Sequence, residues 1–135
     1  MELDWSREPL ADGLRAYRNG EYFLAHEYWE QCWLGCVQPE KTFVQALIQL
    51  ACGMHHFCRG NRRGASSLLD RSLLKLQNYP AEFAGVAVDA LRREITSWIL
   101  ALASPTPPAV WPAPPVPEIR EQRELTWDAP SPGLP

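Results

Sequence analysis

Several features that mark membrane proteins, secreted proteins and common enzymes are missing from this 135-residue sequence. The amino terminus MELDWSREPL has neither the basic run nor the apolar core of a signal peptide. No stretch reaches the roughly 18 apolar residues that a membrane-spanning helix requires. There is also no glycine-rich phosphate loop, no Gly-x-Ser-x-Gly motif and no Ser/His/Asp ordering. We therefore expect a soluble cytoplasmic protein, with no support for nucleotide-binding enzymes or serine hydrolases of those kinds.

The sequence has no excess of positive charge either. Its formal net charge at pH 7 is -3, so the chain as a whole does not attract nucleic acid or an anionic membrane surface. We accordingly expect neither nucleic acid nor membrane as a partner.

A disulfide framework is not indicated. All four cysteines lie within predicted helices, where helical geometry sets their spacing: Cys32, Cys36, Cys52 and Cys58. Reduced thiols packed in the core are therefore the expected state. Cys32 and Cys36 are about one turn apart and could bind zinc as thiolates, but their closeness to Trp29 and Trp33 favours sulfur packed on aromatic rings.

What the sequence does contain is a stretch of about 100 residues with enough apolar side chains, within a chain that is 46% hydrophobic, to form one small core. Helical spacing of these side chains predicts five helices, at about 8–18, 21–36, 40–59, 61–77 and 89–102. Gly20 and Gly60 are suited to the positions that end the first and third helices. The connections are short, so helices adjacent in sequence should pack together. We predict one all-α, bundle-like domain over residues 1–103.

The third helix, at about 40–59, is predicted to be the centre of this bundle. Its apolar positions cover most of the circumference: Phe43, Val44, Leu47, Ile48, Leu50, Ala51, Met54, Phe57 and Cys58. A helix that is apolar nearly all round is typical of a buried position. The narrow strip that remains carries Gln49 and His56, two turns apart and almost in line.

The second helix carries the most unusual combination of side chains. At 100° per residue, one sector of this helix holds five residues: Tyr22, His26, Trp29, Trp33 and Cys36. Glu30 lies on the flank of the sector, and Glu27 lies at its rim. We therefore expect His26 and Glu30 to point inward, where an unpartnered charge would cost several kcal/mol. Gln49 and His56 are the partners that the third helix offers.

Two main hypotheses account for a polar cluster of His26, Glu27, Glu30, Gln49 and His56. In the first, the cluster is a buried hydrogen-bonded network that locks two helices together, and the protein is a non-catalytic binding or interaction protein. In the second, His26, Glu30 and His56 bind a divalent transition metal and Glu27 acts as a base on bound water, as in a metal-dependent hydrolase. A small-ligand pocket is a third alternative. We favour the network because satisfied buried polar clusters are common.

Three arginines surround the turn into the fourth helix: Arg59, Arg62 and Arg63. The free N–H groups at the start of that helix would suit a bound anion. A solvated corner is the favoured interpretation, because clustered surface charges are usually hydrated.

The segment 104–135 differs from the rest, since it contains ten of the thirteen prolines. Proline excludes a regular helix there and favours an extended polyproline conformation. Its apolar side chains are too many for an inert linker: Trp111, Val116, Ile119 and Trp127. We expect this arm to pack partly on the helical body or on a neighbouring subunit, with a frayed end. A homo-oligomer or a protein partner would then be bound through the arm.

A spaced set of residues carries a family resemblance. It comprises Tyr17-x2-Gly20-x-Tyr22-Phe23-x2-His26-Glu27-x2-Glu30-x2-Trp33, then Leu47-Ile48-Gln49-Leu50-Ala51, His56, Gly60-Asn61 and Gly64-Ala65. Over roughly residues 10–103 the sequence resembles the small helical family known as domain of unknown function 309. The resemblance implies an all-helical fold, a signature of His26, Glu27, Glu30 and Trp33 on one helix with Gln49 and His56 on the next, and no established activity. The proline-rich tail is longer than the family pattern.

Overall fold

The computed structural model describes residues 2–120. Within this range the elements, in chain order, are α1 (Leu10–Arg18), α2 (Tyr22–Leu34), α3 (Glu40–Cys58), α4 (Arg62–Leu76), β1 (Glu82–Phe83), β2 (Val86–Ala87) and α5 (Val88–Ala103). The predicted all-α class with five helices is confirmed. Most helix ends lie within one or two residues of the predicted ends, because capping and chain-breaking residues act locally.

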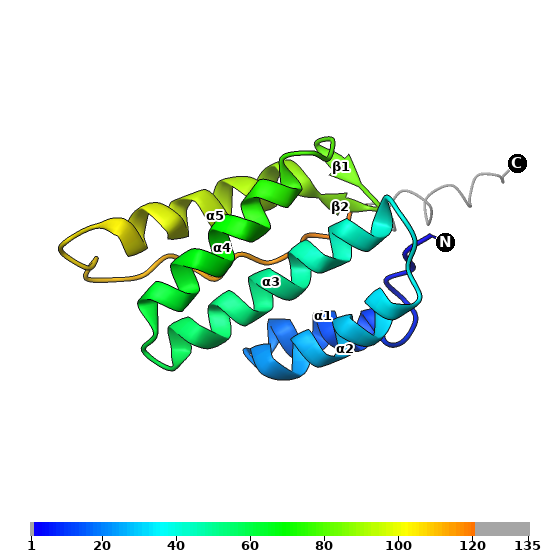
Figure 1. The fold of residues 1–135 in the computed structure, drawn as a ribbon, viewed down its shortest axis with the longest axis horizontal. Helices are drawn as coiled ribbons and strands as arrows, with labels where there is room; N and C mark the ends of the chain where they lie inside the picture. The colour runs from blue at the N-terminus through cyan, green and yellow to red at the C-terminus, as the bar shows by residue number, and fades with distance from the viewer. Residues whose placement is uncertain (1, 121–135) are drawn as a thin grey trace, which may run out of the picture.

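The third helix has the central position that was predicted for it. Figure 1 shows α3 between α2 and α4, with α1 packed on α2 and α5 packed on α4. Phe43, Leu47 and Leu50 of α3 are fully buried. Burying each such side chain contributes about 1.5–3 kcal/mol, so α3 supplies a large share of the hydrophobic stabilisation.

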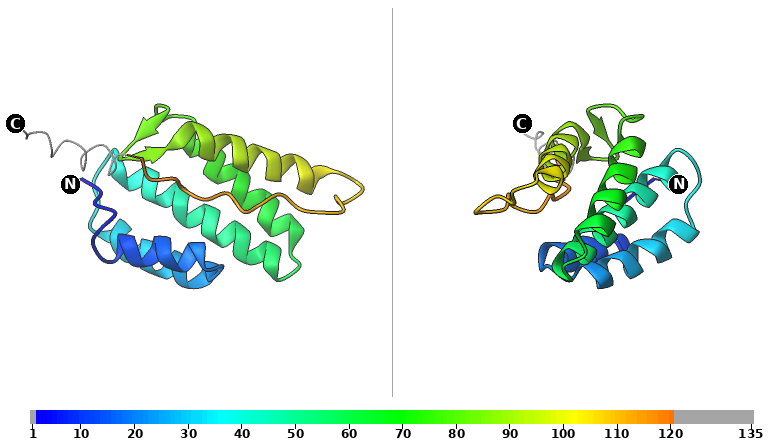
Figure 2. Two further views of the ribbon diagram at one scale, coloured as in Figure 1. Left: turned by 180° about the vertical axis from the view of Figure 1, so that it is seen from behind. Right: turned by 60° about the vertical axis from the view of Figure 1, so that its left-hand side comes forward.

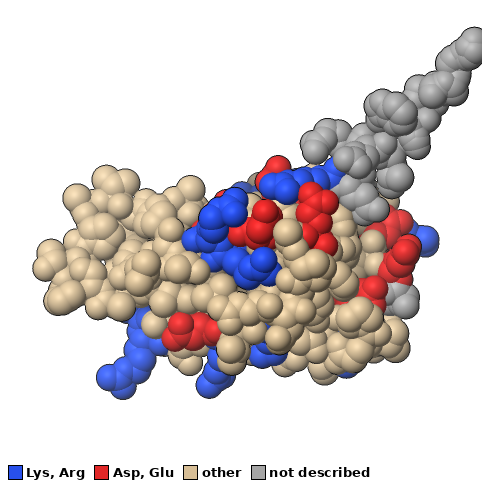
Figure 3. Space-filling model, turned by 90° about the horizontal axis from the view of Figure 1, so that it is seen from above, with Lys and Arg blue, Asp and Glu red and all other residues tan. Residues whose placement is uncertain are grey.

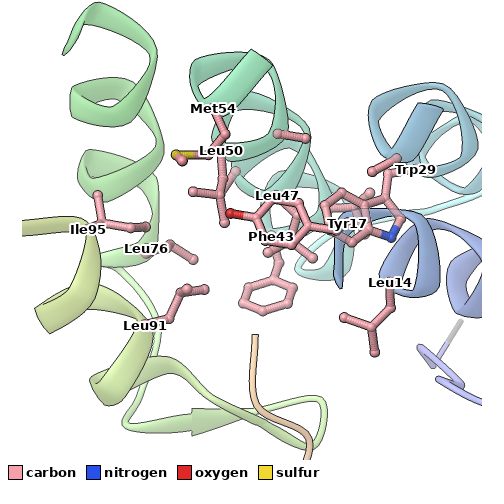
Figure 4. Packing of buried hydrophobic residues seen from close by; sticks show 14 of the residues in the cluster. Leu14, Tyr17, Trp29, Phe43, Leu47, Leu50, Met54, Leu76, Leu91 and Ile95 are labelled. Carbon is pink, nitrogen blue, oxygen red and sulfur yellow. The ribbon is translucent and has the colours of Figure 1, made fainter. Parts of the chain in front are cut away.

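The core continues from α3 toward both sides of the helix array. In Figure 4, Tyr17 and Trp29 lie on the α1–α2 side, and their ring centroids are 5.7 Å apart. On the other side, the core is completed from α4 and α5 by Leu76, Leu91 and Ile95. The hydroxyl of Ser72 on α4 is buried as well and donates to the Ala46 carbonyl of α3 at 2.8 Å, so its polar group is satisfied.

Local signals at the helix ends behave as expected. Gly20 and Gly60 follow α1 and α3 with φ of 80° and 81°, a conformation that glycine adopts without steric cost. Asn61 caps α4, because its side-chain oxygen accepts from the backbone N–H of Gly64 at 2.9 Å. Asp89 lies in the first turn of α5, as predicted.

A small hairpin between α4 and α5 was not predicted. Strands β1 and β2 pair antiparallel, with Glu82 opposite Ala87 and Phe83 opposite Val86. Ala84 and Gly85 between them have φ of 52° and 79°, the positive values that a tight two-residue hairpin turn requires. Strands of two residues are too short to show an alternating pattern, so the sequence indicated only a connection.

The chain after α5 returns along the helices in an extended conformation. Figure 2 shows residues 104–120 running beside α5 toward the hairpin. Along this path Trp98 Nε1 donates to the Ala113 carbonyl at 2.9 Å, and the Tyr17 hydroxyl donates to the Pro115 carbonyl. An isolated β-bridge joins Ile119 to Val86. The predicted frayed end and Trp127 fall in 121–135, outside the described residues.

Within residues 2–120, no helix is both long enough and apolar enough to cross a lipid bilayer.

Candidate functional site

The buried face of α2 differs from the predicted one. The residues of α2 that are buried are Tyr22, Ala25, Trp29 and Cys32, whereas His26 and Trp33 are only partly covered. The buried face of α2 is set by its contacts with both α1 and α3. Trp29 Nε1 donates to the Leu10 carbonyl at 3.3 Å, and the Trp29 ring lies directly over Gly13 of α1. This contact turns α2 so that its small residues face its neighbours and His26 lies at the border with solvent.

His26 and Glu30 are close together, but they lie at the surface. His26 Nε2 and Glu30 Oε2 are 3.6 Å apart, and the two side chains are 16% and 56% exposed. His26 Nδ1 also lies 2.8 Å from the Phe23 carbonyl, one turn earlier. The expectation that Glu30 points inward is therefore wrong, and Glu27 is exposed too. An exposed pair one helical turn apart contributes only about 0.3–0.5 kcal/mol.

Gln49 and His56 do not join this pair. Gln49 Oε1 accepts from Lys75 Nζ of α4 at 3.0 Å. The Nδ1 atom of His56 lies 2.9 Å from Asn61 Nδ2 at the end of α3. The single buried network that was predicted for these side chains is therefore wrong, and they form three separate contacts, of which Gln49–Lys75 is partly buried.

The metal-ligand set is not assembled either. Within residues 2–120, no group of three or more His, Cys, Asp or Glu side chains has an arrangement that could hold a metal ion. His26 and Glu30 approach each other, whereas the side chain of His56 contacts Asn61. The hypothesis of a metal-dependent hydrolase at His26, Glu30 and His56, with Glu27 as base, therefore has no geometric support.

Cys32 and Cys36 behave as buried thiols. Both side chains are buried, their sulfur atoms are 4.0 Å apart, and Cys36 Sγ donates to the Cys32 carbonyl at 3.2 Å. Burial, together with the neighbouring Cys36 thiol, raises the pKa of Cys32 to about 12. All four cysteines were predicted to lie in the core. Only Cys32 and Cys36 are buried, whereas Cys52 is partly exposed and Cys58 is exposed.

His55 of α3 lies beside Phe23 of α2. The sequence pattern did not single out this histidine. The rings of His55 and Phe23 are 5.2 Å apart, and those of His26 and Phe23 are 4.9 Å apart. The pKa of His55 is lowered by burial first, and then by the nearby charges of Arg59, His56 and His26. On the helical wheel His55 lies beside the apolar Ile48, and this position is the sequence signal that could have identified it.

The three arginines at the α3–α4 turn separate into two environments. Arg59 is exposed. Arg62 and Arg63 line a shallow hollow of about 650 Å³ on α4 that is widely open to solvent, together with Ser66, Asp70 and Ser104. Arg59 is not among the residues that line it, so the predicted set of three is divided.

One long segment of the chain has no charged side chains, although Arg62 of α4 lies against it. Residues 95–117 include no Asp, Glu, Lys or Arg, and they form the C-terminal part of α5 and the chain that follows it. Figure 3 shows a mostly tan surface to the left, with blue atoms at its lower edge. Leu100 is 66% exposed and Val110 is 83% exposed. We call the surface made by residues 97–110 the uncharged end.

The uncharged end is supported by a cluster of aromatic rings. The ring centroid of Trp111 lies 4.8 Å from that of Phe57 and 5.3 Å from that of Trp98, on which it is stacked. Arg62 adds a hydrogen bond of 3.1 Å from its guanidinium to the Leu102 carbonyl. The turn after α5 is thus attached to both α3 and α4.

Residues 10–68 match the model of a family described as a domain of unknown function, DUF309. Over these residues the chain is similar to that family. The DUF309 match covers α1, α2, α3 and the first half of α4, so it includes all of α2 and the arginines of the hollow, but not Asp70, Leu102 or Ser104. The family description assigns no activity.

A relative from Aquifex aeolicus (strain VF5) is also similar, and it is described only as an uncharacterized protein. The two sequences are 30% identical over 87 residues, which are 63% of this chain and 26% of the relative. The chain with the DUF309 match therefore spans about a quarter of the length of that relative.

Proposed function

We propose that this protein is a non-catalytic interaction domain that binds a different protein through the uncharged end. The observation that carries the proposal is the exposure of Leu100 and Val110 within a segment, 95–117, that has no charged residue. Exposed apolar groups within a segment that lacks charged residues are typical of the centre of a protein–protein interface, and charges such as Arg62 belong at its border. In this proposal the domain works in the cytoplasm, where its four thiols remain reduced.

The packing beneath this surface supports a binding role. Trp111 is stacked on Trp98, and Arg62 donates to the Leu102 carbonyl, so the turn that presents Val110 is anchored on both sides. A preorganised surface loses little conformational entropy when a partner binds. The observed order therefore favours binding rather than a merely tolerated apolar turn.

The partner is expected to be a protein with an apolar surface. In the A. aeolicus relative, the matching region is about a quarter of a longer chain, so there the similar region is joined to further protein segments. A charged group placed on Leu100 or Val110 would lose hydration without gaining an ion pair from residues 95–117. The expected partner surface is therefore apolar and uncharged.

The test is site-specific photo-crosslinking inside cells. A photo-crosslinking amino acid is placed at position 100 or 110, and the same residue is placed at position 74 as the control, because Leu74 on α4 is 67% exposed but lies outside the uncharged end. We expect one protein to be crosslinked from 100 and 110 and not from 74. The partner is then purified and titrated with the wild type.

Arginine variants complete the test. Leu100→Arg and Val110→Arg should weaken binding of the purified partner at least tenfold, because the partner would bury an uncompensated charge. Leu74→Arg should leave binding unchanged. Equal crosslinking from all three positions, or a crosslink between two copies of this chain, would overturn the proposal.

A further inference from the structure

The hollow on α4 contains more positive charge than its surroundings balance. It has a volume of about 650 Å³, and Arg62 and Arg63 lie at the start of the helix that forms it. Among residues 2–120, neither guanidinium has a carboxylate within 4.0 Å. Arg62 is partly buried, so its charge is incompletely hydrated. A partly buried cation without a counter-ion is stabilised when an anion binds beside it.

Arg62 is also held in place before any ligand is present. One of its terminal nitrogens donates to the Leu102 carbonyl at 3.1 Å, and its guanidinium carbon lies 5.6 Å from the centre of the Trp111 ring. Its Nε is buried and has no hydrogen-bond partner within the described structure. This buried atom cannot be reached by a ligand, so a phosphate group would accept from the other terminal nitrogen, which makes no hydrogen bond within residues 2–120.

Two backbone N–H groups at the start of α4 already have hydrogen-bond acceptors. The Asn61 side chain already accepts from the Gly64 N–H, and the Asn61 carbonyl accepts from the Ala65 N–H at 3.0 Å. Binding therefore depends on side chains. Ser66 and Ser67 add two hydroxyl groups that make no hydrogen bond to other parts of residues 2–120.

The far end of the hollow has the opposite character. Asp70 lines it, seven residues after Arg63 on the same helix, which corresponds to about 10 Å along the axis. A carboxylate there accepts hydrogen bonds and repels an anion. A ligand that contacts both ends therefore carries an anionic group at Arg62 and Arg63 and a hydroxyl group near Asp70. Inorganic phosphate alone is too short to do this.

We propose that the hollow lined by Arg62, Arg63, Ser66, Ser67 and Asp70 binds a small phosphate monoester that carries hydroxyl groups. Both arginines and the serine hydroxyls donate to the phosphate, and Asp70 accepts from a hydroxyl of the ester. The hollow shares Leu102 and Ser104 with the uncharged end, but Arg63 and Asp70 lie outside residues 97–110, so their variants test this proposal separately from Leu100→Arg and Val110→Arg.

Calorimetric titration with three probes tests the proposal: glycerol phosphate, methyl phosphate and glycerol. We expect saturable binding of glycerol phosphate, weaker binding of methyl phosphate and none of glycerol. Arg63→Ala should weaken both phosphates at least tenfold. Arg63 is exposed, so the variant should fold. Asp70→Asn should weaken glycerol phosphate and leave methyl phosphate unchanged or slightly tighter.

The matched control is Arg71→Ala, which removes one exposed positive charge of the same helix outside the hollow. It should leave the binding of both phosphates unchanged. Equal losses in Arg63→Ala and Arg71→Ala would show attraction by general charge only and would overturn the proposal. Absence of saturation with glycerol phosphate at millimolar concentrations would overturn it as well.

Discussion

Trp29 and Gly13 show how one side chain positions a helix. The Trp29 ring fills the space that a side chain at Gly13 would occupy, since a Cβ built there would lie 2.3 Å from Trp29 Nε1. We expect Gly13→Ala to destabilise the fold by roughly 1–3 kcal/mol, because overpacking outweighs the helix propensity that alanine gains. Urea denaturation followed by circular dichroism measures this change.

Gly35→Ala is the matched control for that substitution. A Cβ at Gly35 would have as its nearest neighbour the Cys32 carbonyl oxygen, at 3.9 Å, an ordinary contact distance. Its stability should stay within about 0.5 kcal/mol of the wild type. If Gly13→Ala were as stable as Gly35→Ala, the close contact between α1 and Trp29 would be refuted.

The Cys32 thiol predicts a dependence of stability on alkaline pH. Its pKa is raised to about 12 from the ordinary value of 9.0, so the folded state binds this proton more tightly than the unfolded state does. The stabilising contribution is fully present below pH 9 and is lost as the pH rises from about 9 to about 12. Tyr17, whose pKa burial also raises, contributes in the same direction.

The variant Cys32→Ala isolates this contribution. Between about pH 8 and pH 10.5, its free energy of unfolding should fall less steeply than that of the wild type, because one titrating group has been removed. Urea titrations at several pH values, fitted with a common slope, provide the comparison. Parallel curves for the two proteins would show that Cys32 ionises equally in both states.

At the scale of elements, the extended segment after α5 depends on Trp111. Its ring contacts Phe57 of α3 and Trp98 of α5, so it joins the segment to two helices. We expect Trp111→Ala to lower the free energy of unfolding by roughly 2–3 kcal/mol, slightly below the range for a fully buried tryptophan. Val110→Ala is the control, since that side chain is almost fully exposed and should change stability little. Equal stability of both variants would mean that the segment is not anchored at Trp111.

At the scale of the whole molecule, charge is unevenly distributed. Near the hairpin, Arg120 lies within 4.0 Å of carboxylate oxygens of Glu82, Asp89 and Glu118, and Figure 3 shows red and blue atoms gathered over that part of the molecule. The uncharged end lies at the opposite side of the same view. Long-range electrostatic attraction would therefore act at the hairpin, whereas apolar contact is available at the other end.

The sequence was sufficient to predict the helices and the central position of α3. The apolar stripe that includes Phe43, Leu47 and Leu50 continues nearly all round the helix, and only one location in a bundle can bury such a surface. The capping role of Asn61 was also readable, because an N-cap involves residues within one turn.

The candidate site was predicted less well. A helical wheel places His26 and Trp29 in one sector, but it does not state which edge of that sector faces a neighbour. Ala25 and Cys32 are buried on α2 although both are small. A helical wheel that is oriented by its large apolar side chains does not identify them. The selection of His56 over His55 failed for the same reason, since adjacent residues differ by 100° around α3.

The sequence by itself determined how many helices form and where each one ends, because those outcomes depend on spacing, capping and chain breaks within a few residues. Only the tertiary structure decided that Trp29 faces Gly13, that Glu30 meets solvent, and that Arg62 lies beside Leu102 and Trp111. Each of these results depends on contacts between residues that are distant in sequence, and the rotation of a helix is set by all of its neighbours together.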